Sequence, residues 1–570
     1  MNSLSYIKSV IVISVLVIFS NQLVLGQNKI KPAFRSPVDF PIRLSGTFAE
    51  LRSGHFHSGI DIKTYEQIGK KVYAIADGYI SRINISSGGY GKALYVTHRN
   101  GYTSVFAHLS SYNRTLNNFI REQQRKNKSY EIDISLEKDK FFYKKGDIIA
   151  YTGNTGHSMG PHLHFELRET LSQKPVNPLD FGIKVKDNIS PIIYGVKVYS
   201  DTEMYYLNEI IDVKNRTNSN YHLEKDTIDV FGDVSFGIQT IDMLDDTPNH
   251  DGVYSVKLFV EDTLYFKWEA KKFSFSETRY INSFVDYSEH EMSKRRFMKT
   301  KIEPNNNLGM YSYLKNNGVI VIKNNELLNI RYEVTDVFNN SSECNFVVRG
   351  GNVNKFNLKK EKISCIPLTW DDAHSLVFDD FEINFLKKSF YDDINFSYFV
   401  DNNNEIGEVY HIAKSDIPVQ RYFNFSILQN DIPDSLVKKA VWMEIYEKKY
   451  FPVKTTLMDK RIVAKTRSFG DYVLMIDTIA PKIEILNPQK IYLNKKNNKI
   501  SCIISDSLSG IKSYSCYLNN KWVLSAYDDK NDMLTYEFDE FVNKGDNTLI
   551  IQVVDEKANY TEKELFFQYK

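Results

Sequence analysis

The pattern of hydrophobic and polar positions changes near residue 187 of this 570-residue chain. From there to the C-terminus, short runs rich in Ile, Val, Tyr and Phe alternate with stretches of Asn, Asp and Lys, which is typical of strands joined by turns. Residues 27–186 instead hold most of the Gly-rich turns and seven of the twelve histidines. The pattern predicts a mainly β protein, with the chemistry in an N-terminal domain and several β-sandwich domains after it.

Two segments of the C-terminal part echo each other. Asp-Asn-Ile-Ser-Pro at 187–191 resembles Asp-Thr-Ile-Ala-Pro at 477–481, and Asp336 and Asp555 each precede an asparagine by four residues. These segments resemble bacterial immunoglobulin-like modules. We therefore expect one or two β-sandwich domains over 187–360, a β domain without a recognisable motif over 361–476, and an Ig-like β-sandwich over 477–570.

The first 26 residues have the form of a secretory signal peptide. Lys8 gives a positive start, residues 9–20 are apolar apart from serines, and Val-Leu-Gly at 24–26 offers a cleavage point before Gln27. A membrane anchor is the alternative, but the apolar run is shorter than the roughly 20 residues that span a bilayer. We expect export with cleavage, a periplasmic, cell-envelope or extracellular location, and no stable membrane insertion afterwards.

The charge of the chain bears on its binding partners, and its cysteine content bears on the disulfides it can form. Lys plus Arg is 72 and Asp plus Glu is 71, a net charge of +1, so no global field favours nucleic acid. The four cysteines of an exported chain can be oxidised. Cys344–Cys365 and Cys502–Cys516 would be the local pairs, while two other connectivities and four free thiols stay open.

The densest chemistry lies in residues 153–167, GNTGHSMGPHLHFEL. Gly and Pro crowd the first half and predict a tight loop. His162, His164 and Glu166 then alternate with three apolar residues, which predicts a strand with the apolar set in a core and both histidines on the opposite face. Two imidazoles on one strand face suit metal binding or proton transfer.

Two further segments carry histidines. His57 and Asp61 lie four residues apart with Gly59 between them, so both can bind one ion if the backbone turns. Asn100-Gly101 separates two strand-like runs and is a strong hairpin signal. The second of those runs ends at His108.

Taken together, these segments resemble the lysostaphin/LytM-type zinc endopeptidases, metallopeptidase family twenty-three, over roughly residues 42–181. The markers are His57-x-x-x-Asp61, Ala-His108-Leu and His162-Leu-His164-Phe-Glu, and they occur in the family's order. Members cleave peptide bonds in peptidoglycan cross-bridges or stems by a zinc-activated water.

The resemblance implies one zinc ion bound by His57, Asp61 and His164, with His108 and His162 as catalytic histidines whose individual roles stay open. It also implies that residues 27–186 form an antiparallel β-sheet of the duplicated hybrid motif type, with a groove across one face. An exported zinc metalloendopeptidase that acts on peptidoglycan is the main expectation.

Two alternatives keep the same fold: an exported protease that acts on proteins, and a non-catalytic regulator or binding protein of wall enzymes. The expected partner is a peptidoglycan or peptide substrate. The C-terminal β domains could also contact other envelope proteins, an expectation based on fold analogy alone.

Other residues near these motifs have weaker assignments. His55 and Arg52 could contact the site or a substrate, and Glu166 could orient a ligand. His98 is expected to be structural and His157 to be exposed. Residues 110–144 form an insertion, in which helical spacing predicts a short amphipathic helix followed by a strand over 130–136. Our hypothesis is that this insertion walls the substrate groove.

Overall fold

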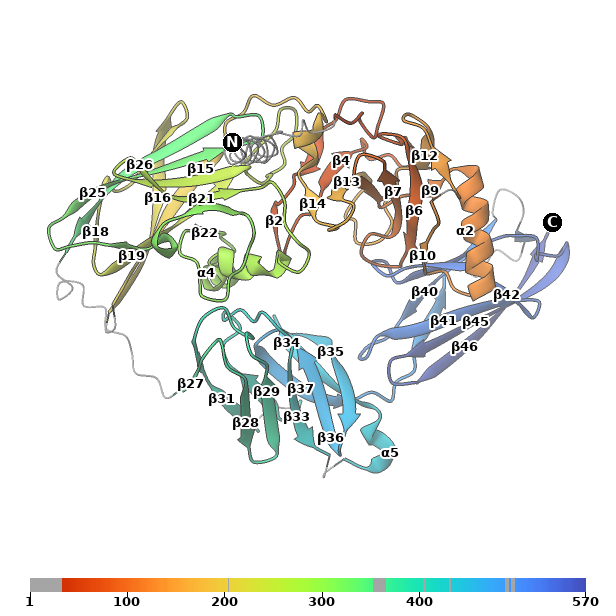
Figure 1. The fold of residues 1–570 in the computed structure, drawn as a ribbon. Helices are drawn as coiled ribbons and strands as arrows, with labels where there is room; N and C mark the ends of the chain where they lie inside the picture. Colours follow the sequence, from red (N-terminus) through yellow and green to blue (C-terminus); the bar gives the residue numbers. More distant parts are fainter. Residues whose placement is uncertain are drawn as a thin grey trace, which may run out of the picture.

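The computed structural model describes residues 33–570, apart from 139, 203–204, 352–364, 403–405, 430–431, 487–491 and 494–497, and it describes only the backbone of 492–493. The predicted signal peptide lies outside the described residues. Strands dominate throughout, which confirms the expected mainly β fold (Figure 1). None of the helices in the described part of the chain combines the length and apolar character that crossing a membrane requires.

The N-terminal unit, residues 33–186, is built on a sheet with the strand order β1-β4-β13-β8-β7-β6-β10. A smaller sheet has the order β5-β12-β9, and β2 and β3 form a short hairpin. The strands of the main sheet are β1 (Leu44–Gly46), β4 (Ile60–Lys63), β13 (His162–Glu169), β8 (Tyr102–Ala107), β7 (Lys92–His98), β6 (Gly78–Ile85) and β10 (Ile132–Ser135), with β11 (Phe142–Tyr143) beside β6 and β14 (Pro175–Val176) beside β13. The others are β2 (Leu51–Arg52), β3 (His55–Phe56), β5 (Lys71–Tyr73), β12 (Ile148–Tyr151) and β9 (Ser111–Tyr112), followed by the 3-10 turn η1 (Pro178–Phe181).

Two local predictions are confirmed in this unit. Strands β7 and β8 pair antiparallel across the Asn100-Gly101 turn, where Gly101 adopts a φ of 87° that favours glycine. The insertion forms helix α2 (Arg114–Asn127), which buries Leu116 and Ile120 and begins at Asn113, whose side chain accepts a hydrogen bond from the Leu116 amide.

The second unit, residues 187–351, has one hydrophobic core enclosed by a long, folded sheet. Its strands, in sheet order, are β22 (Met298–Lys299), β19 (Asp233–Ile241), β15 (Ile192–Asp201), β16 (Tyr206–Thr217), β17 (Asn220–Leu223), β26 (Ser341–Gly350), β25 (Leu327–Thr335), β20 (Ser255–Val260), β21 (Thr263–Glu269) and β23 (Tyr311–Leu314), with β18 (Thr227–Val230) beside β26 and β24 (Ile320–Val321) beside β19. The short turns and helices η2 (Thr278–Tyr280), α3 (Ile281–Phe284), α4 (Tyr287–Ser293) and η3 (Asn316–Gly318) connect these strands.

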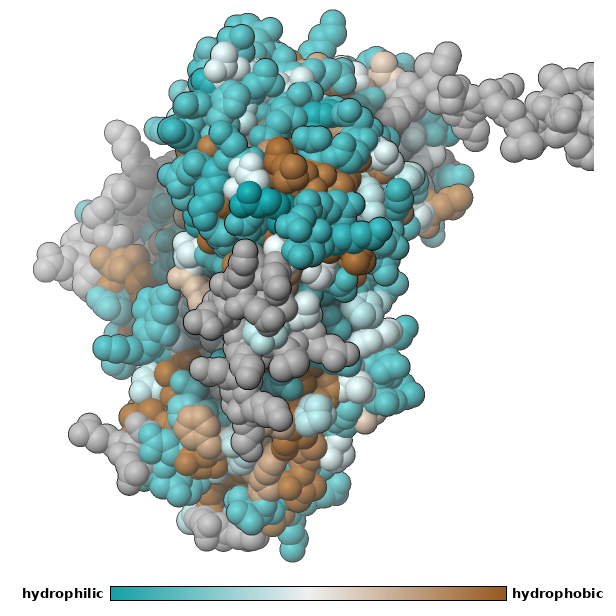
Figure 2. Space-filling view, turned by 90° about the vertical axis from the view of Figure 1, so that its left-hand side faces the viewer, coloured by the Kyte–Doolittle hydropathy of each residue, from teal (hydrophilic) through white to brown (hydrophobic). Residues whose placement is uncertain are grey.

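The third unit, residues 365–476, packs a second β core that is rich in aromatic side chains. Its main sheet runs β28 (His374–Phe378), β29 (Phe381–Phe385), β33 (Phe423–Leu428), β36 (Arg461–Thr466), β35 (Lys449–Met458), β34 (Ala440–Tyr446), β37 (Gly470–Ile476), β32 (Val409–Ile412) and β31 (Tyr398–Asp401). Strands β27 (Ile366–Leu368) and β30 (Ile394–Phe396) pair separately, and helix α5 (Asp434–Val437) follows β33. Apolar residues gather on the surface in the lower part of the molecule, where this unit lies (Figures 1 and 2).

The fourth unit, residues 477–570, has two sheets around a common core. One sheet contains β38 (Lys482–Ile485), β40 (Lys499–Ser505), β44 (Met533–Glu537) and β43 (Ser525–Asp528), and the other contains β39 (Tyr492–Leu493), β46 (Tyr560–Tyr569), β45 (Gly545–Asp555), β41 (Ile511–Leu518) and β42 (Lys521–Val523). Cys502 and Cys516 lie in this core, and all four cysteines are free thiols. The structure therefore agrees with the open alternative of unpaired cysteines.

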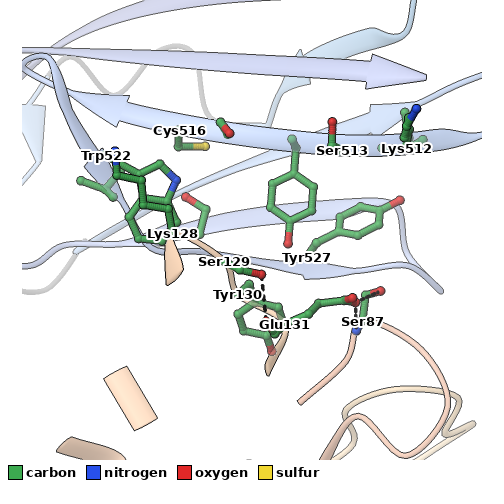
Figure 3. A pocket seen from close by; sticks show the side chains of 15 residues that line it. Ser87, Lys128, Ser129, Tyr130, Glu131, Lys512, Ser513, Cys516, Trp522 and Tyr527 are labelled. Carbon is green, nitrogen blue, oxygen red and sulfur yellow. Dashed lines mark hydrogen bonds between the residues drawn. The ribbon is translucent and has the colours of Figure 1, made fainter. Parts of the chain in front are cut away.

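The chain turns back on itself, so that the fourth unit lies against the first (Figure 1). The Arg125 guanidinium on α2 donates to Glu540, with N–O distances of 2.6 and 2.9 Å. Beside this contact, Tyr130 and Glu131 of the N-terminal unit face Ser513 and Tyr527 of the fourth unit across a pocket of about 490 Å³ (Figure 3). The insertion is therefore a contact surface for the fourth unit.

Candidate metal centre

The strand pairing of β13 sets the frame of the site. His164 lies opposite Asp61 of β4 on one side and opposite Ala107 of β8 on the other. The apolar residues of β13 enter the core of the N-terminal unit, so the alternating histidines lie together on the other face, as predicted. The residue after Ala107 is His108, whose φ of 58° is unusual for a residue other than glycine.

The segment that carries His57 and Asp61 lies directly on β13. A Cβ atom at Gly59 would stand 2.3 Å from the carbonyl oxygen of Phe165, so only glycine allows this close approach. On the other side of His57, the ring of Phe56 is buried in the core of the second unit. The first predicted ligand is therefore held between two units.

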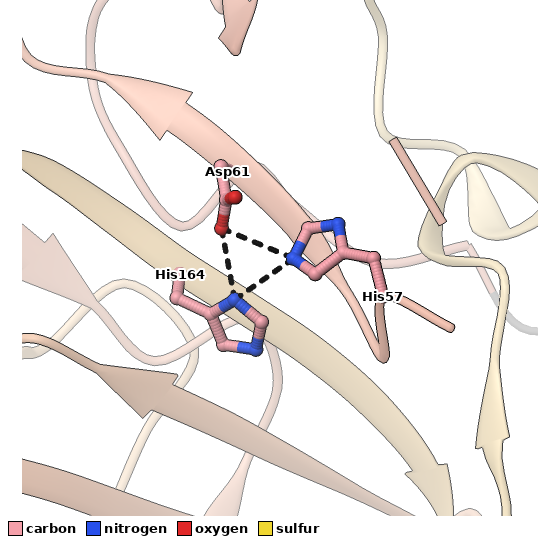
Figure 4. A group of neighbouring side chains, drawn as sticks. All are labelled: His57, Asp61 and His164. Atoms are coloured by element: carbon pink, nitrogen blue, oxygen red, sulfur yellow. Dashed lines mark hydrogen bonds and ion pairs between the residues drawn. The ribbon is translucent and has the colours of Figure 1, made fainter. Parts of the chain in front are cut away.

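Three donor atoms converge where these segments meet (Figure 4). His164 Nδ1 lies 2.8 Å from Asp61 Oδ1 and 3.1 Å from His57 Nε2, and His57 Nε2 lies 3.2 Å from Asp61 Oδ1. All three side chains are buried. The three residues predicted to bind metal thus form one compact group that could hold an ion.

Each imidazole is fixed through its other nitrogen. His57 Nδ1 lies 2.7 Å from the carbonyl oxygen of Thr47, and His164 Nε2 lies 2.9 Å from Glu166 Oε1. A carbonyl oxygen can only accept, so Nδ1 of His57 carries the proton and its Nε2 presents a lone pair. A carboxylate likewise accepts from His164 Nε2, which leaves a lone pair on Nδ1.

Glu166 is itself held by a dense set of donors. Ser58 Oγ and Tyr90 Oη donate to Oε1 at 2.6 and 2.5 Å, and Arg168 Nε donates to Oε2 at 2.6 Å. Burial raises the pKa of Glu166, but the positive charge of Arg168 and the hydrogen bond from His164 outweigh it and hold the pKa well below its usual range. Glu166 therefore stays ionised and orients His164.

The converging lone pairs need a positive charge between them. Burial lowers the pKa of His164, but hydrogen bonds with Asp61 and Glu166 outweigh it and raise the pKa to about 9 when no metal ion is bound. His57 has a lowered pKa because it is buried. At neutral pH a proton or a cation must therefore occupy the space between the three donor atoms.

The two predicted catalytic histidines lie beside this group. The His108 and His162 rings are 4.7 Å apart between centroids, and His162 Nε2 lies 3.5 Å from Asp61 Oδ1. Their Nδ1 atoms lie 2.8 Å from the carbonyl oxygens of Thr155 and Gly160 respectively. Burial lowers the pKa of both, that of His108 to about 3, so both rings are neutral at pH 7.

A cavity of about 810 Å³ opens at this site. Its wall includes Asp61, His108 and His162 from the N-terminal unit, together with Asp246 and Arg296 from the second unit. No residue of the insertion, as far as the structure describes it, lines this cavity. This lining gives no support to the hypothesis that the insertion walls the groove, and α2 packs toward the fourth unit.

The other residues that the sequence suggested near the site lie in different environments. Arg52 donates to Asp61 Oδ2 at 2.6 Å and so belongs to the site as an ion-pair partner of a predicted ligand. His55 is exposed and contacts the Ser53 carbonyl, and His98 is buried between Ser104 and a backbone carbonyl. His157 is exposed, as predicted.

The loop before β13 is also contacted by the fourth unit. Asp529 Oδ2 lies 3.4 Å from Nε2 of His157, and the Lys530 ammonium donates to the carbonyl oxygens of Asn154 and Ser158. Ser158 Oγ in turn lies 3.1 Å from His162 Nδ1. The last unit of the chain therefore supports the loop that positions one of the two predicted catalytic histidines.

Comparison with known sequences agrees with this geometry. Residues 55–125 and 133–178 match the sequence profile described as Peptidase family M23. The N-terminal unit contains a peptidase family M23 domain. Residues 366–477, which the sequence alone left without a recognisable motif, match a Zu5-like domain.

The M23 domain is similar to named proteins over a limited length. DD-carboxypeptidase/endopeptidase Mpg of Neisseria meningitidis serogroup B is 32% identical over 133 residues, 23% of this chain and 24% of Mpg. Lysostaphin of Staphylococcus simulans is 29% identical over 115 residues, 20% of this chain and 18% of lysostaphin. Murein hydrolase activator NlpD of Escherichia coli is 33% identical over 135 residues, 24% of this chain and 28% of NlpD. The chain thus matches between 18% and 28% of the length of these relatives.

Sequence reasoning missed several residues of the M23 domain site. Arg168 continues the alternation of His162, His164 and Glu166 on β13, so the period of two was a usable signal for it. Tyr90 and Thr47 had no such signal, because they come from separate segments and only their tertiary positions bring them to Glu166 and His57.

Proposed function

We propose that this chain is an exported zinc-dependent endopeptidase that hydrolyses peptide bonds in peptidoglycan cross-bridges or stems. The observation that carries the proposal is the convergence of His57 Nε2, Asp61 Oδ1 and His164 Nδ1, with the other nitrogen of each imidazole fixed by an acceptor. The relatives' printed names, an endopeptidase and a murein hydrolase activator among them, support a wall substrate.

The donor set fits zinc. Catalytic zinc sites use three nitrogen or oxygen donors at about 2.0–2.2 Å and leave a fourth position open, which puts tetrahedral donor atoms roughly 3.3 Å apart. The three donor pairs here are 2.8, 3.1 and 3.2 Å apart, so a small outward movement would accommodate the ion. Bound there, zinc would supply Lewis-acid activation of water near neutral pH.

His108 and His162 are suited to proton transfer next to that position. Their Nδ1 atoms donate to backbone carbonyls, which leaves each Nε2 as a lone-pair acceptor. Because both rings are neutral at pH 7, each Nε2 can accept a hydrogen bond from a water molecule or from the substrate beside the metal position. The cavity beside them has room for an extended peptide segment.

A non-catalytic role as a wall-enzyme activator is the second candidate, because NlpD is among the relatives. Full retention of the five-residue set in one place favours catalysis. Hydrolysis of proteins through the same site would differ only in substrate.

Incubation of purified mature protein with peptidoglycan sacculi and with a protein substrate would separate these functions. Mass spectrometry should find new amino termini in released muropeptides, and metal analysis should find one zinc per chain. His57→Ala should abolish both release and zinc binding, whereas His55→Ala, the exposed histidine two residues away, should leave them unchanged. Full release by His57→Ala, or no release by the wild type, would exclude the proposal. Export predicts that the mature chain begins near Gln27.

A further inference from the structure

Three aspartates converge from separate loops at one end of the second unit. Asp187 precedes β15, Asp242 follows β19, and Asp336 follows β25. One carboxylate oxygen from each lies within 4.8 Å of the others, which is a spacing that can hold a metal ion. Asp242 is only 3% exposed and Asp336 only 1%, so bulk solvent screens their charges poorly.

A second observation also suggests a ligand at this group of aspartates. Asp242 Oδ1 is buried without any hydrogen-bond partner, and so is Asp187 Oδ2. Leaving a buried polar atom unpaired costs about 1–3 kcal/mol, and more when the group is charged. The other oxygen atoms are used structurally: Asp187 Oδ1 accepts from the Ile189 amide, and Asp336 Oδ1 accepts from the Asn340 amide at 2.9 Å.

The electrostatics of the group are unfavourable without a cation. Burial, followed by the charges of Asp336 and Asp187, raises the pKa of Asp242 to about 9. Burial and the adjacent Asp336 also raise the pKa of Asp187 to about 7. Without a cation, the three carboxyl groups can lie this close only when protons neutralise part of their charge.

The fourth unit repeats the arrangement in detail. Asp477, Asp506 and Asp555 precede β38, follow β40 and end β45, and they also lie within 4.8 Å of one another. Asp555 binds the amide and side chain of Asn559 as Asp336 binds those of Asn340. Asp506 Oδ1 is likewise buried without a partner. The same placement of three carboxylates therefore occurs in two units of the chain.

We propose that Asp187, Asp242 and Asp336 bind a calcium ion. Carboxylate oxygens alone favour hard cations, and calcium accepts irregular sets of six to eight oxygen ligands, some of them water. One carboxylate oxygen of each aspartate would be a ligand. Calcium would displace the protons from this group and hold the three carboxylates in their ionised form.

The position of the site gives it a structural role. Leu244, two residues after Asp242, is part of the hydrophobic core of the N-terminal unit, and Phe338, two residues after Asp336, packs against that core. Asp187 lies where the chain passes from the first unit to the second. Calcium at this point would therefore tie the M23 domain rigidly to the second unit.

Calcium binding can be measured directly on the full chain. Mature protein is stripped of divalent ions on a chelating resin, reloaded with one equivalent of zinc, and titrated with CaCl2 by calorimetry and thermal unfolding. We expect a Kd near the 10⁻⁴–10⁻³ M of extracellular modules, and a Tm rise of about 2–5 °C at saturating calcium. Absence of heat and of a Tm shift in the wild type would overturn the proposal.

Variants of single aspartates test which of the two aspartate groups binds the calcium ion. Asp242→Asn should lose this calcium response, because it removes an anionic ligand while keeping the size of the side chain. Asp506→Asn, the equivalent change in the fourth unit, should keep an Asp242-dependent response. A normal calcium titration in Asp242→Asn, or loss of the entire response in Asp506→Asn alone, would contradict the assignment. If Asp242→Asn does not fold, Asp187→Asn, at a less buried position, repeats the test.

Discussion

Glu166 offers the sharpest test of how His164, a proposed zinc ligand, is held. The change Glu166→Gln keeps the size of the side chain and leaves one oxygen that can still accept from His164, Tyr90 and Ser58. Its amide nitrogen would instead face Arg168 Nε, donor against donor, where Oε2 now accepts at 2.6 Å. The substitution thus removes the negative charge behind His164 and leaves a buried guanidinium unpaired.

The effects of Glu166→Gln on zinc affinity and on stability can both be given an expected size. Removing a partner that orients a metal ligand typically costs 10–100-fold in metal affinity, so zinc binding should weaken by about 1.4–2.7 kcal/mol. Leaving the buried cation unpaired should lower the free energy of unfolding by about 3–5 kcal/mol. The double change Glu166→Gln with Arg168→Met removes that cation, and should recover stability without recovering zinc affinity.

Competition with a chromogenic chelator at pH 7.5 measures the zinc affinity, and urea unfolding measures stability. Glu169→Gln is the matched control, because this acid lies three residues further along the same strand and binds Ser172 and Lys272 at the surface. Zinc affinity of folded Glu166→Gln within twofold of the wild type would refute the role given to the carboxylate.

Three further outcomes are expected. Phe56→Ala should lower the free energy of unfolding by about 3–5 kcal/mol and weaken zinc binding, because the Phe56 ring is buried in the second unit next to His57. An unchanged midpoint of urea unfolding would contradict this prediction. The raised pKa of His164, about 9 in the metal-free protein, means that a proton competes with zinc below pH 9; zinc affinity should fall about 100-fold from pH 8.5 to 6.5, and a flat profile would exclude this competition. Arg52→Met removes the 2.6 Å ion pair to Asp61 and should weaken zinc about tenfold with little change in Tm, whereas unchanged zinc affinity would show that the pair is dispensable.

Local patterns in the sequence determined much of the site. The period of two over residues 162–167 placed both histidines on one strand face, because successive side chains of any strand point to opposite sides. The Asn-Gly turn indicated the hairpin that ends at His108, because Gly101 adopts a φ of 87° that residues other than glycine rarely adopt. Both signals are carried by neighbours in the chain, and for that reason they could be read without a structure.

Contacts between distant segments were decided only by the tertiary structure. The hairpin before His57 packs into the second unit, Gly252 of that unit bonds Thr47, and Lys530 reaches the loop before His162 from the far end of the chain. The sequence echo of Asp187 and Asp477 was visible, yet the convergence of three carboxylates at each was not. Such contacts depend on which surfaces fit when whole units pack together, and no local periodicity encodes that choice.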